Sequence, residues 1–262
     1  MPDDQIIYSV TSGVAVITIN RPNALNALSI EAIHSLAKKL RDADNSPTVS
    51  LVVIRGAGDR AFCAGADIRI FDSFKDPNEG RNFWRKTGPE IHSYIEKMTK
   101  PVIAAVSGYC LGGGLEIALS CDLVIATDDS KFGFPEVNIG LIPGWGGTQR
   151  IARIVGRHKA KQFVMLGEMI GAGDAERLGI VNWVVKRENL DAFVNEVTSK
   201  LIQKSSLVLS RAKDAVNQAY DLTLNEGLSY ETELSTSLLS TKDTKEGVRA
   251  FLEKRKPTFK SK

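Results

Sequence analysis

The chain has 262 residues, of which 43% are hydrophobic, so it holds enough apolar material for a packed core. Its 34 Lys and Arg residues against 31 Asp and Glu leave a formal net charge of +3, too small to indicate a polyanion as the main partner. The three cysteines, Cys63, Cys110 and Cys121, form no CxxC pair, which argues against a disulfide framework and a thiolate zinc site. This cysteine usage is typical of a reducing cytoplasm.

The sequence predicts neither a targeting segment nor a membrane span. Residues 1–5 are polar and acidic, unlike a signal or transit peptide. The longest apolar run without a charge near its centre covers residues 102–115, includes four glycines, and is well short of the roughly 20 residues that span a bilayer. We therefore expect a soluble, cytoplasmic protein without a membrane partner.

Strands are predicted where β-branched or alternating runs are bounded by turn residues. In chain order, these runs cover residues 6–10, 14–20, 50–55, 102–106, 123–126 and 181–185. The first two are joined by Thr11, Ser12 and Gly13, which predicts a hairpin.

Helical patterns lie between these strands. Ser29 is placed to cap a helix that ends near Asp44, and spaced apolar positions predict a second helix over residues 79–100. A third helix is predicted over residues 113–120, directly after a glycine cluster. The first two thirds of the chain therefore alternate between strand and helix.

The last third of the chain changes to an all-helical pattern. Amphipathic helices are predicted over residues 190–203, 206–220, 225–239 and 243–254. The pattern indicates an α/β core over residues 1–204 and a helical region over residues 205–262. The apolar faces of this helical region need a cover, which predicts oligomerisation.

Several common catalytic motifs are absent. The sequence has no G-x-x-x-x-G-K-[ST] phosphate loop, no G-x-G-x-x-G fingerprint, no H-E-x-x-H and no G-x-S-x-G. His34, His92 and His158 lack metal-ligand spacing, so surface or structural roles are favoured for them. These observations argue against metal, nicotinamide and serine-hydrolase chemistry.

Two glycine-containing loops each follow a predicted strand. The first covers residues 56–68, and the second passes through Gly112, Gly113 and Gly114 to Glu116. Three glycines at a helix start leave the first amides uncovered, where unpaired N–H groups and the helix dipole favour negative charge. Such a turn can bind an oxyanion, although a lone glycine triplet more often serves close packing or a tight turn.

Read together with Glu116 and Glu136, these loops resemble successive signature segments of the enoyl-CoA hydratase (crotonase) family. The matching segments cover residues 20–28, 62–68, 108–122, 132–150 and 251–260. They occur in the family's order and extend over essentially the whole chain.

The resemblance implies roles for four residues. The amides of Ala66 and Gly113 are expected to form an oxyanion hole for the thioester carbonyl, where one donor is worth about 2.7–4 kcal/mol to the transition state. Glu116 is expected to position and deprotonate water, and Glu136 to act as the acid/base at the α carbon. Family isomerases generally lack a carboxylate at the position of Glu116, so the presence of both glutamates favours a hydratase or dehydratase.

The resemblance also implies contacts with the substrate. The residues expected to contact coenzyme A or the acyl group are Asn23, Ala24, Leu25, Ala64, Asp67, Ile68, Arg69, Gly112, Phe134, Pro143, Gly144, Trp145 and Lys256. Asn23 departs from the family, because some members carry a lysine there. The rings of Phe134 and Trp145 predict a short acyl chain, with simple packing in the core as the alternative.

The family fold is a spiral of ββα units with a helical C-terminal region that builds trimers, commonly paired into hexamers. The implied reaction is reversible syn hydration of a short-chain 2-enoyl-CoA, a lyase reaction with coenzyme A as part of the substrate and no metal or redox cofactor. Two alternatives stay open: another crotonase reaction such as double-bond isomerisation, and a nucleic-acid-binding family member. The small net charge argues against the latter.

Overall fold

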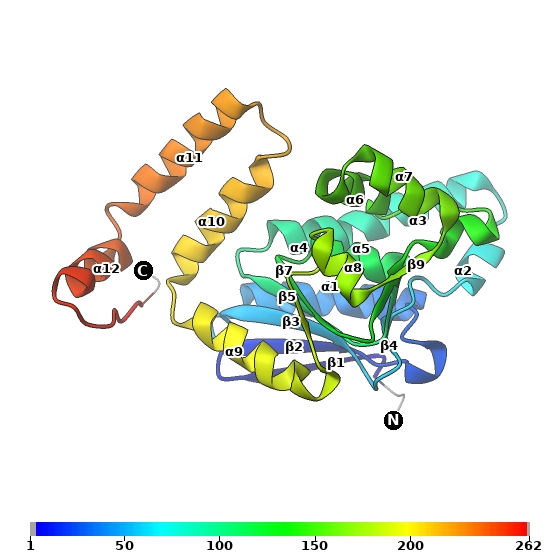
Figure 1. Ribbon diagram of the computed structural model, residues 1–262, viewed down its shortest axis with the longest axis horizontal. Coiled ribbons are helices and arrows are strands. Elements are labelled where there is room, and N and C mark those ends of the chain that lie inside the picture. The colour runs from blue at the N-terminus through cyan, green and yellow to red at the C-terminus, as the bar shows by residue number, and fades with distance from the viewer. Residues whose placement is uncertain (1–3, 261–262) are drawn as a thin grey trace.

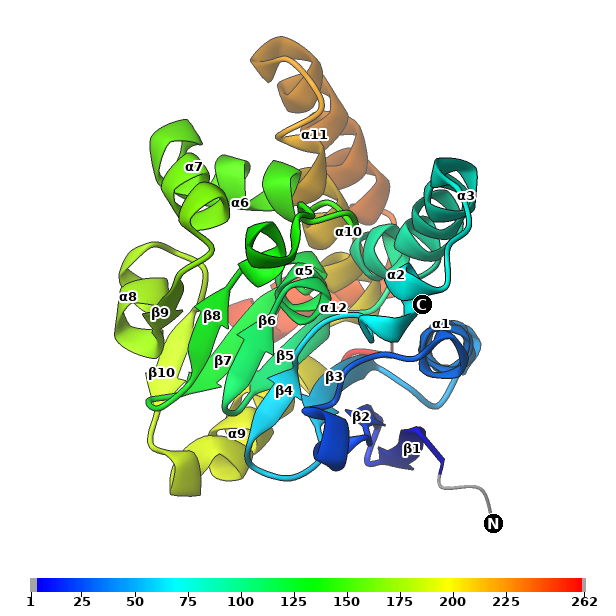
Figure 2. The same ribbon diagram turned by 90° about the vertical axis from the view of Figure 1, so that its right-hand side faces the viewer.

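Two β-sheets form the body of the protein in a computed structural model that describes residues 4–260 (Figures 1 and 2). The larger sheet consists, in spatial order, of β1 (Ile6–Thr11), β2 (Val14–Ile19), β3 (Leu51–Gly56), β5 (Val102–Val106), β7 (Leu123–Thr127) and β10 (Trp183–Val185). The smaller sheet consists of β4 (Ala61–Cys63), β6 (Tyr109–Leu111), β8 (Lys131–Gly133) and β9 (Met169–Gly171).

The larger sheet matches the strands predicted from the sequence. β1 and β2 form the predicted antiparallel hairpin, in which Thr11 pairs with Val14. Ser12 and Gly13 both have positive φ, as a two-residue hairpin turn requires. The remaining strands pair in parallel and are rich in Val, Ile and Ala because both faces of the sheet are covered.

The chain alternates between the two sheets. It passes from β5 to β6 and then into α5 (Gly113–Ser120), before β7 and β8 repeat the same step. This alternation is the predicted spiral of ββα units. The strands of the smaller sheet were not predicted, because segments of three residues are too short to show an alternating pattern.

Helices cover the sheets. α1 (Ile30–Asn45) begins as predicted at Ser29, whose hydroxyl accepts a hydrogen bond from Ala32 N–H at 3.2 Å. The predicted helix over residues 79–100 is divided into α3 (Pro77–Gly88), a π-helical turn η2 (Pro89–Ser93) and α4 (Tyr94–Lys97). The other helices of the body are α2 (Arg69–Asp72), α6 (Gly147–Val155), α7 (Arg157–Leu166), α8 (Ala172–Arg177) and α9 (Leu190–Ile202).

The last helices extend from the body as an arm (Figure 1). α9 still packs on the larger sheet through Leu190, Val194 and Val197. α10 (Ser206–Gln218), α11 (Leu224–Leu238) and α12 (Lys242–Leu252) form the arm, so the boundary predicted after residue 204 falls in the turn before it. Within residues 4–260, no helix combines the length and hydropathy that crossing a bilayer requires.

Candidate active site

The ends of three parallel strands bring the two glycine loops and both glutamates together. Cys63 of β4 pairs with Cys110 of β6, and Leu111 of β6 pairs with Gly133 of β8. The first loop, the glycine turn and the segment that carries Glu136 follow these three strands in turn. Because the carboxyl ends of parallel strands meet at one edge of a sheet, the three segments meet there (Figure 2).

The orientation of the Ala66 amide is set by a parallel bridge to Leu28. Leu28 N–H donates to Gly65 O at 2.8 Å, and Asp67 N–H donates to Leu28 O at 2.9 Å. In this parallel bridge the N–H of Ala66 points away from Leu28. A side-chain carbon at Gly65 would lie 3.0 Å from Gly113 N, so the first loop and the glycine turn are in contact.

The glycine turn has the tight conformation and the close packing that the sequence left open as one alternative. Gly112 adopts φ +50° and ψ −125°, a conformation that favours glycine. A Cβ at Gly114 would lie 2.1 Å from Cys63 O, so close packing also requires glycine there. Gly113 is the first residue of α5, and its N–H therefore has no acceptor within the helix.

Glu116 lies inside the protein on α5 and is only 1% exposed. Its Oε1 accepts hydrogen bonds from Trp145 N–H and Gly147 N–H, each at 2.7 Å. These amides lie at the start of α6, where the helix dipole favours a negative charge. Burial raises the pKa of Glu116 to about 7, while the two amides and Arg150 oppose the increase.

Glu136 lies across the glycine turn, on a 3-10 turn η3 (Pro135–Ile139) that follows β8. A Cβ at Gly112 would be 2.9 Å from its Oε1, and its buried Oε2 has no hydrogen-bond partner among the described residues. Burial raises the pKa of Glu136 to about 7, and the charge of Glu116 adds to the increase. Two interacting carboxyl groups that titrate near neutrality are suited to exchanging a proton.

The segment Asn23 to Leu25 lies beside the first loop. Asn23 and Ala24 belong to a 3-10 turn η1 (Pro22–Ala24), and Ala64 N–H donates to Leu25 O at 3.0 Å. Sequence reasoning did not single out Asn26, which is fully buried and donates from Nδ2 to Ala57 O at 3.0 Å and Ala61 O at 2.6 Å. The only feature of the sequence that pointed to Asn26 was its position within residues 20–28, a segment that resembles the family.

Asp67 forms ion pairs with two arginines beside the first loop. Arg69 Nη2 lies 2.6 Å and Arg21 Nη2 3.2 Å from Asp67 Oδ2. The hydrogen bond from Arg69, with help from Arg21, holds the pKa of Asp67 well below its usual range. Arg69 is 78% exposed at its side chain, and Ile68 is also exposed, so both are accessible from solvent beside the first loop.

Trp145 and Phe134 pack against different neighbours. The ring of Trp145 lies against Gly113, where a Cβ would be 2.5 Å from it. Phe134 is fully buried and contacts Phe163 edge to face, with ring centroids 5.7 Å apart.

Three further predicted residues have different surroundings. Pro143 is buried beside Gly147, whereas Gly144 is exposed and lies against the ring of Trp84. Lys256 is exposed and follows α12, the last helix of the arm that extends from the body in Figure 1.

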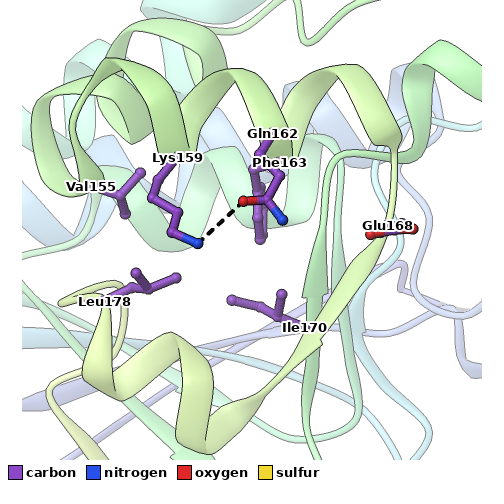
Figure 3. Close-up of a pocket in the computed structure, with 7 residues that line it drawn as sticks. All are labelled: Val155, Lys159, Gln162, Phe163, Glu168, Ile170 and Leu178. Atoms are coloured by element: carbon purple, nitrogen blue, oxygen red, sulfur yellow. Dashed lines mark hydrogen bonds between the residues drawn. The ribbon is translucent and has the colours of Figure 1, made fainter.

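Two hollows lie outside the pair of glutamates. A cavity of about 70 Å³ between α7, β9 and α8 is lined by apolar side chains such as Phe163, Ile170 and Leu178 (Figure 3). Lys159 and Gln162 are joined at its rim by a 3.2 Å hydrogen bond. A larger groove of about 980 Å³ separates α10 from α3, α4 and α6. Neither Glu116 nor Glu136 lines either hollow. The candidate site is therefore identified by the segments that meet at the ends of β4, β6 and β8, and not by the size of a cavity.

Comparisons with known proteins agree with this geometry. Residues 9–262 match the model of the family described as enoyl-CoA hydratase/isomerase. The chain is 40% identical over 262 residues to a crotonyl-CoA hydratase from Syntrophomonas wolfei, covering 100% of both chains. It is 40% identical over 255 residues to a short-chain-enoyl-CoA hydratase from Clostridium acetobutylicum, covering 97% of this chain and 96% of the relative.

Solved structures show the same likeness. A structure of an enoyl-CoA hydratase subunit from Geobacillus kaustophilus superposes with a TM-score of 0.93 at 40% identity, covering 98% of each chain. An enoyl-CoA hydratase from Bacillus anthracis gives a TM-score of 0.92 at 32% identity, covering 99% of this chain and 100% of that one. The chain therefore belongs to the enoyl-CoA hydratase/isomerase family.

Proposed function

We propose that the protein catalyses reversible syn hydration of a short-chain 2-enoyl-CoA to the 3-hydroxyacyl-CoA. The observation that carries the proposal is that two glutamates meet at the glycine turn next to the Ala66 loop: the buried Glu116 in the first turn of α5, and Glu136 with its carboxyl group beside Gly112. Relatives named as crotonyl-CoA and short-chain-enoyl-CoA hydratases support the reaction and the chain length.

The thioester carbonyl is bound by the N–H groups of Ala66 and Gly113. Hydration of the double bond passes through an enolate-like state, so donors fixed at this oxygen lower the barrier. Glu116 takes a proton from the water that attacks the β carbon, and Glu136 delivers a proton to the α carbon. Because both carboxyl groups have a pKa of about 7, the pair can hold one proton between them near neutral pH.

The test is the loss of enoyl-thioester absorbance with crotonyl-CoA in Glu116→Gln and Glu136→Gln variants. Each variant is expected to lose about 10²–10⁴-fold in kcat, the usual contribution of a general acid or base. Glu168→Gln, which changes a carboxyl group beside the cavity of Figure 3, is the matched control and should keep full activity. Undiminished hydration in either glutamate variant would contradict the assignment, and double-bond migration without hydration would favour an isomerase.

We propose a short acyl chain because the Trp145 ring narrows the space beside Gly113. Trp145→Ala should therefore raise kcat/KM for a ten-carbon substrate relative to crotonyl-CoA. An unchanged ratio would remove this ring from the specificity argument.

The proposed reaction uses proton transfer and needs no resident metal or redox cofactor, with coenzyme A entering as part of the substrate. Among the described residues, no three His, Cys, Asp or Glu side chains are grouped as metal ligands. Activity that disappears on dialysis against a chelator and returns with a metal ion would contradict this part of the proposal.

We further propose that the arm joins copies of the chain into a trimer or a pair of trimers. Large apolar side chains on it are exposed, including Leu224 at 78%, Phe251 at 82% and Leu252 at 75%. Burying such surface is favourable by roughly 25 cal/mol per Å². A second copy could also bring Lys256 to the coenzyme A phosphates. Light scattering of a Phe251→Glu/Leu252→Glu variant should show a smaller assembly; an unchanged mass would exclude these two side chains from the interface.

A further inference from the structure

Trp145 is held at both ends of its main chain and on both sides of its ring. Its N–H donates to Glu116 Oε1 at 2.7 Å, and its carbonyl accepts from Arg150 Nη1 at 2.8 Å. Arg150 is itself fixed by two bonds to Glu96, at 2.6 and 2.8 Å. The indole ring lies against the Cα of Gly113. One residue therefore contacts both the carboxylate of Glu116 and the first residue of α5.

Thr87 fixes the edge of the indole ring. Trp145 Nε1–H donates to Thr87 Oγ1 at 2.8 Å, and the same hydroxyl donates to Phe83 O at 2.6 Å. Thr87 is only 3% exposed, so water does not readily replace the bond. The donor and acceptor capacities of this hydroxyl are both used, which restricts the ring to one orientation.

His92 supports one face of the same ring. The two rings stack with centroids 5.2 Å apart and an interplanar angle of 27°. His92 is 1% exposed, and burial lowers its pKa to about 3, so the ring is neutral at physiological pH. The backbones of Gly88 and Gly113 adjoin it, but neither ring nitrogen forms a hydrogen bond of good geometry with a described residue. Its ring therefore supports Trp145 by stacking.

The π-helical turn η2 explains how His92 reaches this place. Ile91 and His92 are consecutive and both are buried, with the turn in contact with α1 and α5. A π turn adds a residue to the helical repeat, and such turns are frequent at functional sites. The helical segment over residues 77–97 thus supplies both Thr87 and His92 to Trp145.

We propose that Thr87 and His92 are positioning residues, which hold Trp145 so that its amide orients the Glu116 carboxylate for the water. This inference rests on the proposed hydration and adds residues that do not touch the reacting atoms. Loosening the ring would let the amide and the Gly113 turn shift together. A misplacement of about 1 Å at a reacting group can cost about 100-fold in rate, so smaller shifts should lower kcat while leaving KM nearly unchanged.

A double-mutant cycle between Thr87 and Trp145 tests the proposal. Thr87→Val keeps the shape but removes the acceptor, and should lower kcat about tenfold. Thr87→Ser restores the hydroxyl and should recover most of the activity. In a Trp145→Phe background, where Nε1 is absent, Thr87→Val should change kcat less than twofold, because its partner is already gone. Thr99→Val, which removes a hydroxyl bonded to Asp44 on the surface, is the matched control.

A second pair of variants tests the role of His92. His92→Phe retains a stacking ring and should keep kcat within about threefold, whereas His92→Ala should lower it about tenfold. Equal losses in both variants would show that the imidazole nitrogens matter, which overturns a role through shape.

The pH profile of kcat separates positioning from general destabilisation. The groups that act on Glu116 are the two amides, Arg150 and the neighbouring Glu136. A loosened Trp145 amide stabilises the carboxylate less, so Thr87→Val should move the profile to higher pH. A folded variant with wild-type kcat, or equal Thr87→Val losses in both backgrounds, would overturn the inference. An inactive wild-type enzyme would instead refute the proposed hydration itself.

Discussion

Replacing Gly112 by alanine should damage the site through both the backbone and a neighbouring acid. Gly112 has φ +50° and ψ −125°, where a residue with a side chain is strained by about 1–3 kcal/mol. The new Cβ would lie 2.9 Å from Glu136 Oε1 and 3.4 Å from its Cδ. The carboxyl group is the end of a flexible side chain, so it would rotate away by a few tenths of an ångström at least.

The expected loss of activity follows from the two groups that this turn positions, the N–H of Gly113 and the carboxyl group of Glu136. Relief of the strain at Gly112 rotates the next peptide, which carries the N–H of Gly113, while the contact displaces Glu136. Loss of one oxyanion donor costs about 2.7–4 kcal/mol, or 10²–10³-fold in kcat. We therefore expect Gly112→Ala to lower kcat at least 100-fold and the free energy of unfolding by about 1–3 kcal/mol.

Gly156→Ala provides the matched control. Gly156 also has positive φ, at +77°, but nothing lies within 4 Å of the added Cβ. It should lose similar stability and keep its activity. The assay is crotonyl-CoA hydration together with chemical denaturation of both variants. If Gly112→Ala lost no more activity than Gly156→Ala, the turn would not orient the catalytic groups.

Three further predictions concern charge. The pKa of Glu116 rises on folding from 4.5 to about 7, so the native protein binds this proton more tightly than the unfolded chain. The free energy of unfolding should therefore fall by about 3 kcal/mol as the pH rises from 4.5 to about 7. Glu116→Gln should flatten that dependence in denaturation at pH 5 and pH 8; an unaltered slope would contradict it. Lys213→Met leaves its 2.9 Å partner Asp122 without a counter-charge and should lower the free energy of unfolding by about 3 kcal/mol, partly recovered by Asp122→Asn. Full stability of the single variant would contradict a stabilising role for this ion pair. Asp67→Asn should raise KM for crotonyl-CoA about fivefold, because Arg21 and Arg69 would lose the charged partner that holds them beside the first loop. An unchanged KM would show that these ion pairs do not contribute to substrate binding.

The sequence predicted the parts of the fold that have long patterns. The strands of the larger sheet and the α1 helix with its Ser29 cap were found because alternation and capping are local signals. The smaller sheet was missed, although it aligns the two glycine loops and both glutamates, because β4, β6 and β8 have three residues each. The π turn within residues 79–100 was also missed, since its apolar spacing is close to that of an ordinary helix.

The candidate site was predicted as a set of residues rather than as an arrangement. The resemblance to the family named Glu116, Glu136 and the two expected amide donors. The hydrogen bonds from the Trp145 and Gly147 amides to Glu116 join residues 29 and 31 positions apart, so no local sequence pattern predicts them. Thr87 was missed for the same reason, and His92 was assigned a surface or structural role without its contact with the distant Trp145 ring.

Glu116 and Glu136 lie on segments that follow the neighbouring strands β6 and β8, and this placement affects how such an enzyme can acquire new substrates. Parallel strands lie about 4.8 Å apart, and this spacing is set by main-chain hydrogen bonds rather than by side chains. The rings of Phe83 and Trp84 belong instead to α3, outside the smaller sheet. Substitutions among them can reshape the space for the acyl group while the acids keep their separation. Divergence in chain length therefore does not require the proton-transfer machinery to be rebuilt.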